Sequence, residues 1–179
     1  IEIRRNKMLK KKSTRIILIV LLGALVIAGG GLAYYRLSRI QGTVETSIIN
    51  EKLANKEVPK VVVFTQDRTF KNEVMKKITN DIKKKDVYLE IQPIEEITDE
   101  LSEWDKVVIF TTIQSSEPPE NVLPIITKYK EDKRVGVFLT AESGEWAHQP
   151  DDVEAFSAAS RNLDNVDEFT NKILDFINE

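Results

Sequence analysis

The sequence contains no cysteine, which excludes disulfide bonds, zinc–cysteine sites and thiol catalysis. Its single histidine, His148, rules out a metal site built from several imidazoles, and a lone histidine of this kind is usually solvated. Glycine is also scarce, and none occurs between Gly42 and Gly136. Since glycine lets backbone amides close around a phosphate, this gap argues against a glycine-rich nucleotide loop.

One long apolar run is present. Residues 16–35, IILIVLLGALVIAGGGLAYY, contain no charged residue. A helix rises about 1.5 Å per residue, so about 20 apolar residues cross the hydrocarbon core of a bilayer. The run therefore predicts a transmembrane helix in contact with membrane lipid, and Tyr34 and Tyr35 suit a membrane interface. The alternative, a buried helix of a soluble core, seldom runs this long without a charge.

The charges that flank the run predict its orientation. Seven Lys or Arg residues precede Ile16, and two closely follow Tyr35. Basic residues beside a membrane helix are retained in the cytoplasm. We therefore expect a basic cytoplasmic N-terminus over residues 1–15, and a single pass that places the rest of the chain outside a prokaryotic cell.

Two questions about processing stay open at this stage. A basic segment before an apolar one also describes a signal peptide, and Gly31 or Ala33 could precede a cleavage site. The length of the run favours a retained anchor. Arg4 and Arg5 stand shortly before Met8, which is consistent with a ribosome-binding site in the transcript and favours Met8 over Ile1 as the start of translation.

Charge divides the chain into a basic and an acidic part. The first 40 residues hold nine Lys or Arg and one acid, Glu2; of totals of 26 and 29, this leaves 17 bases and 28 acids, a net charge of −11, for residues 41–179. Nucleic-acid binding needs clustered cations to neutralise phosphates, so an acidic outer part is poorly suited to it. The charge also keeps a domain soluble.

The part of the chain after the apolar run is expected to hold a linker and one domain. Residues 36–59 are mixed and weakly amphipathic, and they predict a partly helical juxtamembrane linker that ends at Pro59. Residues 60–179 have the size of one ordinary domain and can bury a single core.

Short apolar runs alternate with amphipathic segments in this domain. The predicted strands are 60–65, 86–92, 106–112, 134–140 and 153–157, and the predicted helices are 70–84, 94–103, 120–132 and 166–178. Strand and helix in alternation imply right-handed βαβ units, hence a parallel sheet of the α/β class with helices on both faces. Such folds bind ligands at the carboxyl ends of their strands.

Three loops follow the predicted central strands and are rich in hydroxyl and amide groups. They read TQDRTFKN (65–72), TTIQSSEPPEN (111–121) and TAESGEWAHQP (140–150). In layout they resemble the flavodoxin family, which has a hydroxyl-rich phosphate loop, then a flavin-contacting loop with a proline-rich entry to the next helix, then a short Gly- and Ser-containing loop. The resemblance covers residues 60–179 and rests on layout more than on a strict motif.

This resemblance implies a flavodoxin-like, doubly wound parallel sheet of five strands in the order 2-1-3-4-5, preceded by the transmembrane helix. It also implies FMN as the cofactor of an electron-transfer protein, in which the flavin supplies the chemistry. No catalytic side chain and no metal ligand is expected. The residues that the resemblance assigns to the cofactor are Thr65, Gln66, Arg68, Thr69, Lys71, Thr111, Thr112, Gln114, Ser115, Thr140, Ser143, Gly144 and Trp146.

The chain also departs from the family pattern. The phosphate loop has no glycine, and Asp67 within it would repel a phosphate, so this loop is also consistent with a polar segment that caps a helix. Trp146 suits stacking on a flavin ring or packing on the edge of its own domain. The alternative function is therefore a degenerate flavodoxin-like fold that acts as a non-catalytic extracytoplasmic binding or interaction module, with an unknown protein or redox partner.

Other functions of similar folds lack their residues here. A receiver domain needs an aspartate at the end of its third strand, where this chain has Thr111 and Thr112. A Walker loop and a nucleophile elbow are both absent from the sequence. Glu117 and Glu120 form a pair of acids without a base or a metal pattern beside them, and we interpret them as solvated loop charges.

Overall fold

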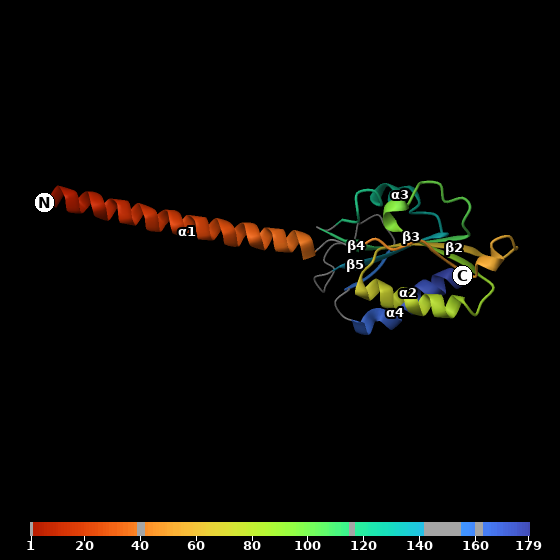
Figure 1. Ribbon diagram of the computed structural model, residues 1–179. Coiled ribbons are helices and arrows are strands. Elements are labelled where there is room, and N and C mark those ends of the chain that lie inside the picture. The colour runs from red at the N-terminus through yellow and green to blue at the C-terminus, as the bar shows by residue number, and fades with distance from the viewer. Residues whose placement is uncertain (1, 39–41, 115–116, 142–154, 160–162) are drawn as a thin grey trace. The chain divides into compact units, whose positions relative to one another are not determined.

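The computed structural model describes residues 2–38, 42–114, 117–141, 155–159 and 163–179. It divides into two compact units, residues 1–40 and residues 41–179 (Figure 1). The first unit is a helix, and the second is a sheet domain that holds the candidate site.

Helix α1 spans Glu2–Ser38 and forms the first unit. Its stretch Thr14–Tyr35 has 22 residues with a mean hydropathy of 2.7, and it is long and apolar enough to cross a membrane. The most apolar part of that stretch is not buried against other residues that the structure describes. The expected apolar helix is present, and the basic segment before it is helical as well.

The second unit is built on a six-stranded mixed sheet with the order β1-β3-β2-β4-β5-β6. Strands β2 to β6 pair in parallel, and β1 pairs antiparallel with β3 at one edge. The strands are β1 (Ser47–Ile49), β2 (Lys60–Thr65), β3 (Tyr88–Pro93), β4 (Lys106–Ile113), β5 (Val135–Ala141) and β6 (Ala155–Ala159).

The sheet confirms an α/β fold with a mostly parallel sheet. It corrects the expected number and order of strands, because a sixth strand, β1, lies antiparallel at one edge. The parallel strands run β3-β2-β4-β5-β6, an arrangement of the doubly wound, flavodoxin-like kind. The sequence prediction omitted the antiparallel edge strand β1, whose three residues are too few to show an alternating pattern.

Part of the expected linker, residues 36–59, belongs to this sheet domain. After β1, the 3-10 turn η1 (Glu51–Leu53) buries Leu53, which is 5% exposed. Asn50, in the left-handed region with φ 59°, donates from Nδ2 to the carbonyl oxygens of Ile82, Lys85 and Val87 at 2.9–3.0 Å. These bonds attach the turn after β1 to the end of the first domain helix.

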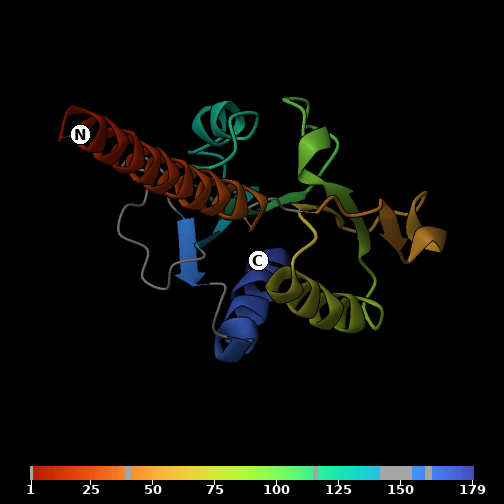
Figure 2. The ribbon, with the colours of Figure 1, turned by 60° about the vertical axis from the view of Figure 1, so that its left-hand side comes forward.

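Helices cover both faces of the sheet. Helices α2 (Thr69–Ile82) and α4 (Val166–Asn178) lie side by side on one face, and α3 (Leu123–Lys128) lies on the other (Figures 1 and 2). Phe70 of α2 meets Phe169 of α4 edge to face, with ring centroids 5.3 Å apart. The 3-10 turns η2 (Ile94–Glu96) and η3 (Leu163–Asn165) complete the described elements.

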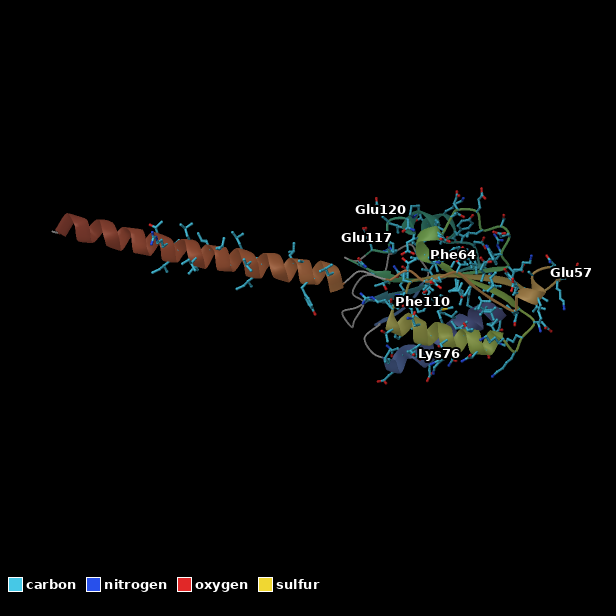
Figure 3. All side chains as sticks on the ribbon, in the orientation of Figure 1. Glu57, Phe64, Lys76, Phe110, Glu117 and Glu120 are labelled. Atoms are coloured by element: carbon cyan, nitrogen blue, oxygen red, sulfur yellow. The ribbon has the colours of Figure 1, made fainter. Side chains whose placement is uncertain are left out.

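Alternation along β4 divides the core into two clusters, one on each face. Val107 and Ile109 belong to the cluster under α3, whereas Val108 and Phe110 belong to the cluster under α2 and α4. Phe64 and Phe110 mark the two sides in Figure 3. Ile109 is fully buried, and β4 pairs with β2 and with β5, so β4 is a central strand as predicted.

Two predicted helices differ from the observed elements. Residues 94–103 form only η2, because Ile97 leaves the turn in an extended conformation with ψ 129°. The helical spacing of apolar residues there comes from burial of Ile94 and Leu101 in an irregular segment. The helix expected over 120–132 is shorter, because the ring of Pro124 would clash with the carbonyl of residue 120 in a helix that began there.

Candidate functional site

The carboxyl ends of β2, β4 and β5 bring polar side chains together. Gln66 directly follows β2, and Thr111 and Thr112 lie near the end of β4. Thr140 of β5 is paired in register with Thr112. Parallel strands present their carboxyl ends at one edge of a sheet, where doubly wound folds bind ligands.

These side chains form a buried hydrogen-bonded network. Thr111 Oγ1 and the backbone amide of Thr112 donate to Gln66 Oε1 at 3.2 and 3.0 Å. The hydroxyls of Thr112 and Thr140 are 3.1 Å apart. The ammonium group of Lys71, from the first turn of α2, donates to both of these hydroxyls, at 3.1 Å for Thr140.

Lys71 is the largest polar side chain in this network and is only 1% exposed. An isolated ammonium group is costly to remove from water, so a buried lysine needs partners for its donors. The threonine hydroxyls supply some of them, and the ring of Phe110 lies 5.6 Å from Nζ. The network therefore has an evident structural role in holding α2 to the ends of β4 and β5.

Of the thirteen residues that the resemblance assigns to a cofactor, nine are described, and six of these nine are inside this network or buried beside it. Of the described ones, Arg68 is half-buried, while Thr69 and Gln114 are exposed. Ser115, Ser143, Gly144 and Trp146 lie outside the described residues, as does His148. The buried members are Thr65, Gln66, Lys71, Thr111, Thr112 and Thr140.

Gly42, which precedes β1, lies against the loop between β2 and α2 and pairs with Asp67 of that loop. Its amide donates to the carbonyl oxygen of Asp67 at 3.1 Å, and the amide of Asp67 donates back to the Gly42 carbonyl oxygen at 2.7 Å. A Cβ at Gly42 would lie 2.9 Å from Cβ of Asp67, so this close approach requires glycine. Asn72 Nδ2 donates to Asp67 Oδ1 at 2.7 Å and holds the carboxylate at the loop.

This loop does not fit the phosphate of a flavin nucleotide. A phosphate site at a helix N-terminus needs free amides that point at the anion, and here the Asp67 amide already donates to Gly42. The exposed carboxylate of Asp67 would repel a phosphate at the same place. Thr65 Oγ1 is buried, and it has no hydrogen-bond partner among the residues that the structure describes.

A cavity of about 770 Å³ lies beside the network, and its lining includes Gln66. The segment after β4 in the chain forms its outer wall, and there Gln114 and Glu117 exchange backbone hydrogen bonds of 2.9 and 3.1 Å. Figure 3 places Glu117 and Glu120 together at this end of the domain, near α3. The lining residues are Gln66, Gln114, Glu117, Pro118, Pro119, Glu120, Leu123 and Pro124.

A second hollow, of about 370 Å³, lies against β3. Tyr88 stacks there on Trp104, with centroids 6.3 Å apart and an interplanar angle of 15°. Burial and the nearby carboxylate of Glu90 raise the pKa of the Tyr88 hydroxyl above its ordinary value. Trp104 is 8% exposed, as expected for a core residue.

Sequence reasoning missed two features of this region. It placed Gly42 in a linker, although an isolated glycine beside a domain that is otherwise poor in glycine signals a close backbone contact. It also interpreted Glu117 and Glu120 as solvated loop charges only. The prolines around them signal a rigid wall, but the sequence does not reveal the cavity that they line.

Comparisons with known proteins name no family for this chain. No family model and no curated protein matches the chain. A solved structure described as the metal-soaked Flv1 flavodiiron core from Synechocystis sp. PCC6803 is similar with a TM-score of 0.47 and 10% sequence identity. The match covers 69% of this chain and 37% of that one, so the chain corresponds to little more than a third of that protein.

Proposed function

We propose that this chain is a membrane-anchored, flavodoxin-like domain that acts as an extracytoplasmic binding module and holds no flavin. The observation that carries the proposal is the paired backbone hydrogen bonding of Gly42 and Asp67 in the β2–α2 loop. In this loop the amide of Asp67, a donor that a cofactor phosphate would use, is bonded to the protein's own backbone. The strand-end hydroxyls are bonded to one another and to Lys71.

The anchor in this proposal is α1, with the sheet domain outside the cell. Its support is the 22-residue apolar stretch Thr14–Tyr35, together with the excess of basic residues before it. Protease added to intact spheroplasts should then digest residues 41–179. Protection of these residues until the cells are lysed would reverse the orientation.

Electron transfer through FMN is the competing proposal. It is motivated by the family layout of the strand-end loops, and the Asp67 amide could contribute to it only if the Gly42 segment left the β2–α2 loop. The cost of that opening would reduce the apparent affinity for FMN. Bound FMN would be held by Thr69 and Arg68 at the helix and by groups beyond the described residues.

Titration with FMN separates the two proposals. The full-length chain in a neutral detergent should neither quench flavin fluorescence nor show a higher melting temperature in the presence of millimolar FMN. Riboflavin, which lacks the phosphate, is the matched control for contacts made by the ring alone. Saturable quenching by FMN but not by riboflavin would show a working phosphate site and overturn the proposal.

A further inference from the structure

We infer that the 770 Å³ cavity binds a positively charged peptide segment, with a Lys or Arg side chain at Glu117 and Glu120 and a backbone carbonyl at Gln66. The inference rests on the proposed function, since it names the partner of the binding module. It follows from the hydrogen-bond donor that Gln66 presents, the charge of the cavity and the character of its walls.

Gln66 lines the cavity and has an unused donor. Its side chain is 5% exposed, and its Oε1 accepts hydrogen bonds from the Thr112 amide and the Thr111 hydroxyl. A backbone amide can only donate, so it fixes the oxygen of the Gln66 amide toward β4 and leaves the NH₂ group for the cavity side. Within the described residues this NH₂ has no partner, and a carbonyl oxygen is the acceptor that it suits.

The cavity favours a cation over an anion. Among the eight lining residues that the structure describes, Glu117 and Glu120 are acidic and none is basic. Both carboxylates are exposed at the rim, where they can pair with an ammonium or guanidinium group that stays partly solvated. The sheet unit as a whole carries 28 acids and 17 bases, so its long-range field also attracts cations.

The walls are apolar and fixed in place. Pro118, Pro119, Leu123 and Pro124 supply the apolar surface. The loop is fastened at its far end, because Asn121 Nδ2 donates to the Ile94 carbonyl oxygen at 3.1 Å. A wall that is already ordered loses little conformational entropy on binding, which favours an extended segment that lies along it.

The size of the cavity matches this class of ligand. At about 770 Å³ it lies within the usual range of roughly 300–1,000 Å³ for ligand pockets. A single amine would fill only a small part of this volume. A few residues of peptide would place a basic side chain at the rim and a carbonyl at Gln66 together.

The test is a calorimetric titration of the full-length chain in neutral detergent with three probes. These are the capped peptide Ac-Ala-Lys-Ala-Arg-Ala-NH₂, the same peptide with Glu and Asp for Lys and Arg, and spermidine. The basic peptide should bind saturably with a dissociation constant of millimolar or below, and the acidic peptide should not bind. Spermidine, which has no carbonyl, should bind at least tenfold more weakly.

Charge-removing variants locate the site. Glu117→Gln with Glu120→Gln should weaken peptide binding about tenfold, because each exposed ion pair contributes a few-fold. The matched control, Glu57→Gln with Glu168→Gln, removes the same charge elsewhere and should bind as the wild type does. Both control residues are exposed, and Glu57 lies at the opposite end of the domain in Figure 3.

Three results would overturn the inference. These are absence of peptide binding, equal weakening by both double variants, and spermidine binding equal to that of the peptide. These results are independent of the flavin test. A chain that binds neither FMN nor the basic peptide retains the proposed function and loses this partner, whereas one that binds FMN through its phosphate loses the proposed function itself.

Discussion

Replacement of Gly42 by alanine should destabilise the sheet domain. The new Cβ would lie 2.9 Å from Cβ and 3.0 Å from Oδ2 of Asp67. The first of these atoms belongs to the rigid base of the side chain, so rotation of the carboxylate cannot relieve the contact. Either the backbone shifts, or the two Gly42–Asp67 hydrogen bonds break.

Both routes lead to a similar free-energy cost. Overpacking in a tight contact costs about 1–3 kcal/mol, and loss of two ordinary hydrogen bonds costs about 0.5–1.5 kcal/mol each. We therefore expect Gly42→Ala to lower the free energy of unfolding of the domain by about 1–3 kcal/mol. Urea denaturation of the full-length chain, followed by tryptophan fluorescence, reports this change through Trp104, which is buried on Tyr88.

The matched control for this variant is Gly30→Ala in α1. A Cβ at Gly30 meets no atom within 4 Å, so the unfolding transition of the sheet domain should be unchanged. The Asp67 amide should also exchange its hydrogen faster in Gly42→Ala than in the wild type, because its acceptor has moved. Wild-type stability together with wild-type exchange at Asp67 would refute the close approach of Gly42 to this loop.

Further substitutions test the core, the polar network and the acid response. Ile109→Ala should cost about 2–5 kcal/mol of unfolding free energy, the usual range for a buried isoleucine, and a loss below about 1 kcal/mol would contradict its central place in the sheet. Gln66→Leu should cost about 1–3 kcal/mol, because it leaves the buried Thr112 amide without its acceptor; unchanged stability would contradict that bond. Hydrogen bonds from Arg134 lower the pKa of Asp132, so this carboxylate stabilises the fold above the unfolded pKa of about 3.9 and ceases to do so as the pH falls through its lowered folded pKa. Asp132→Asn should thus lower the melting temperature at neutral pH, and a difference that persists well below pH 3.9 would contradict the charge effect.

The sequence predicts the larger elements of the fold well. β-Branched and aromatic runs mark β2, β4 and β5, because central parallel strands are buried on both faces. The four-residue spacing of Phe70, Val74, Ile78 and Ile82 marks α2, and all four side chains are buried. Local pattern is sufficient where burial repeats with a regular period.

Elements held by single tertiary contacts were not predictable in this way. Strand β1 is three residues long, and the turn after it depends on Asn50 reaching three carbonyl oxygens between Ile82 and Val87. The candidate site shows the same limit. The hydroxyl-rich loops were recognised as polar, but the inward direction of Lys71 and Gln66 depends on partners that are more than 40 residues away in the chain.

The central claim is that this domain is a binding module that holds no flavin. It is tested most directly by measuring the flavin content of the full-length chain. The protein is isolated from the membranes of flavin-replete cells without added cofactor, denatured, and assayed for released flavin by fluorescence. We expect a colourless protein that releases only trace flavin. Release of one FMN per chain would contradict the account, because it would require a phosphate site that the bonded Gly42–Asp67 loop does not provide.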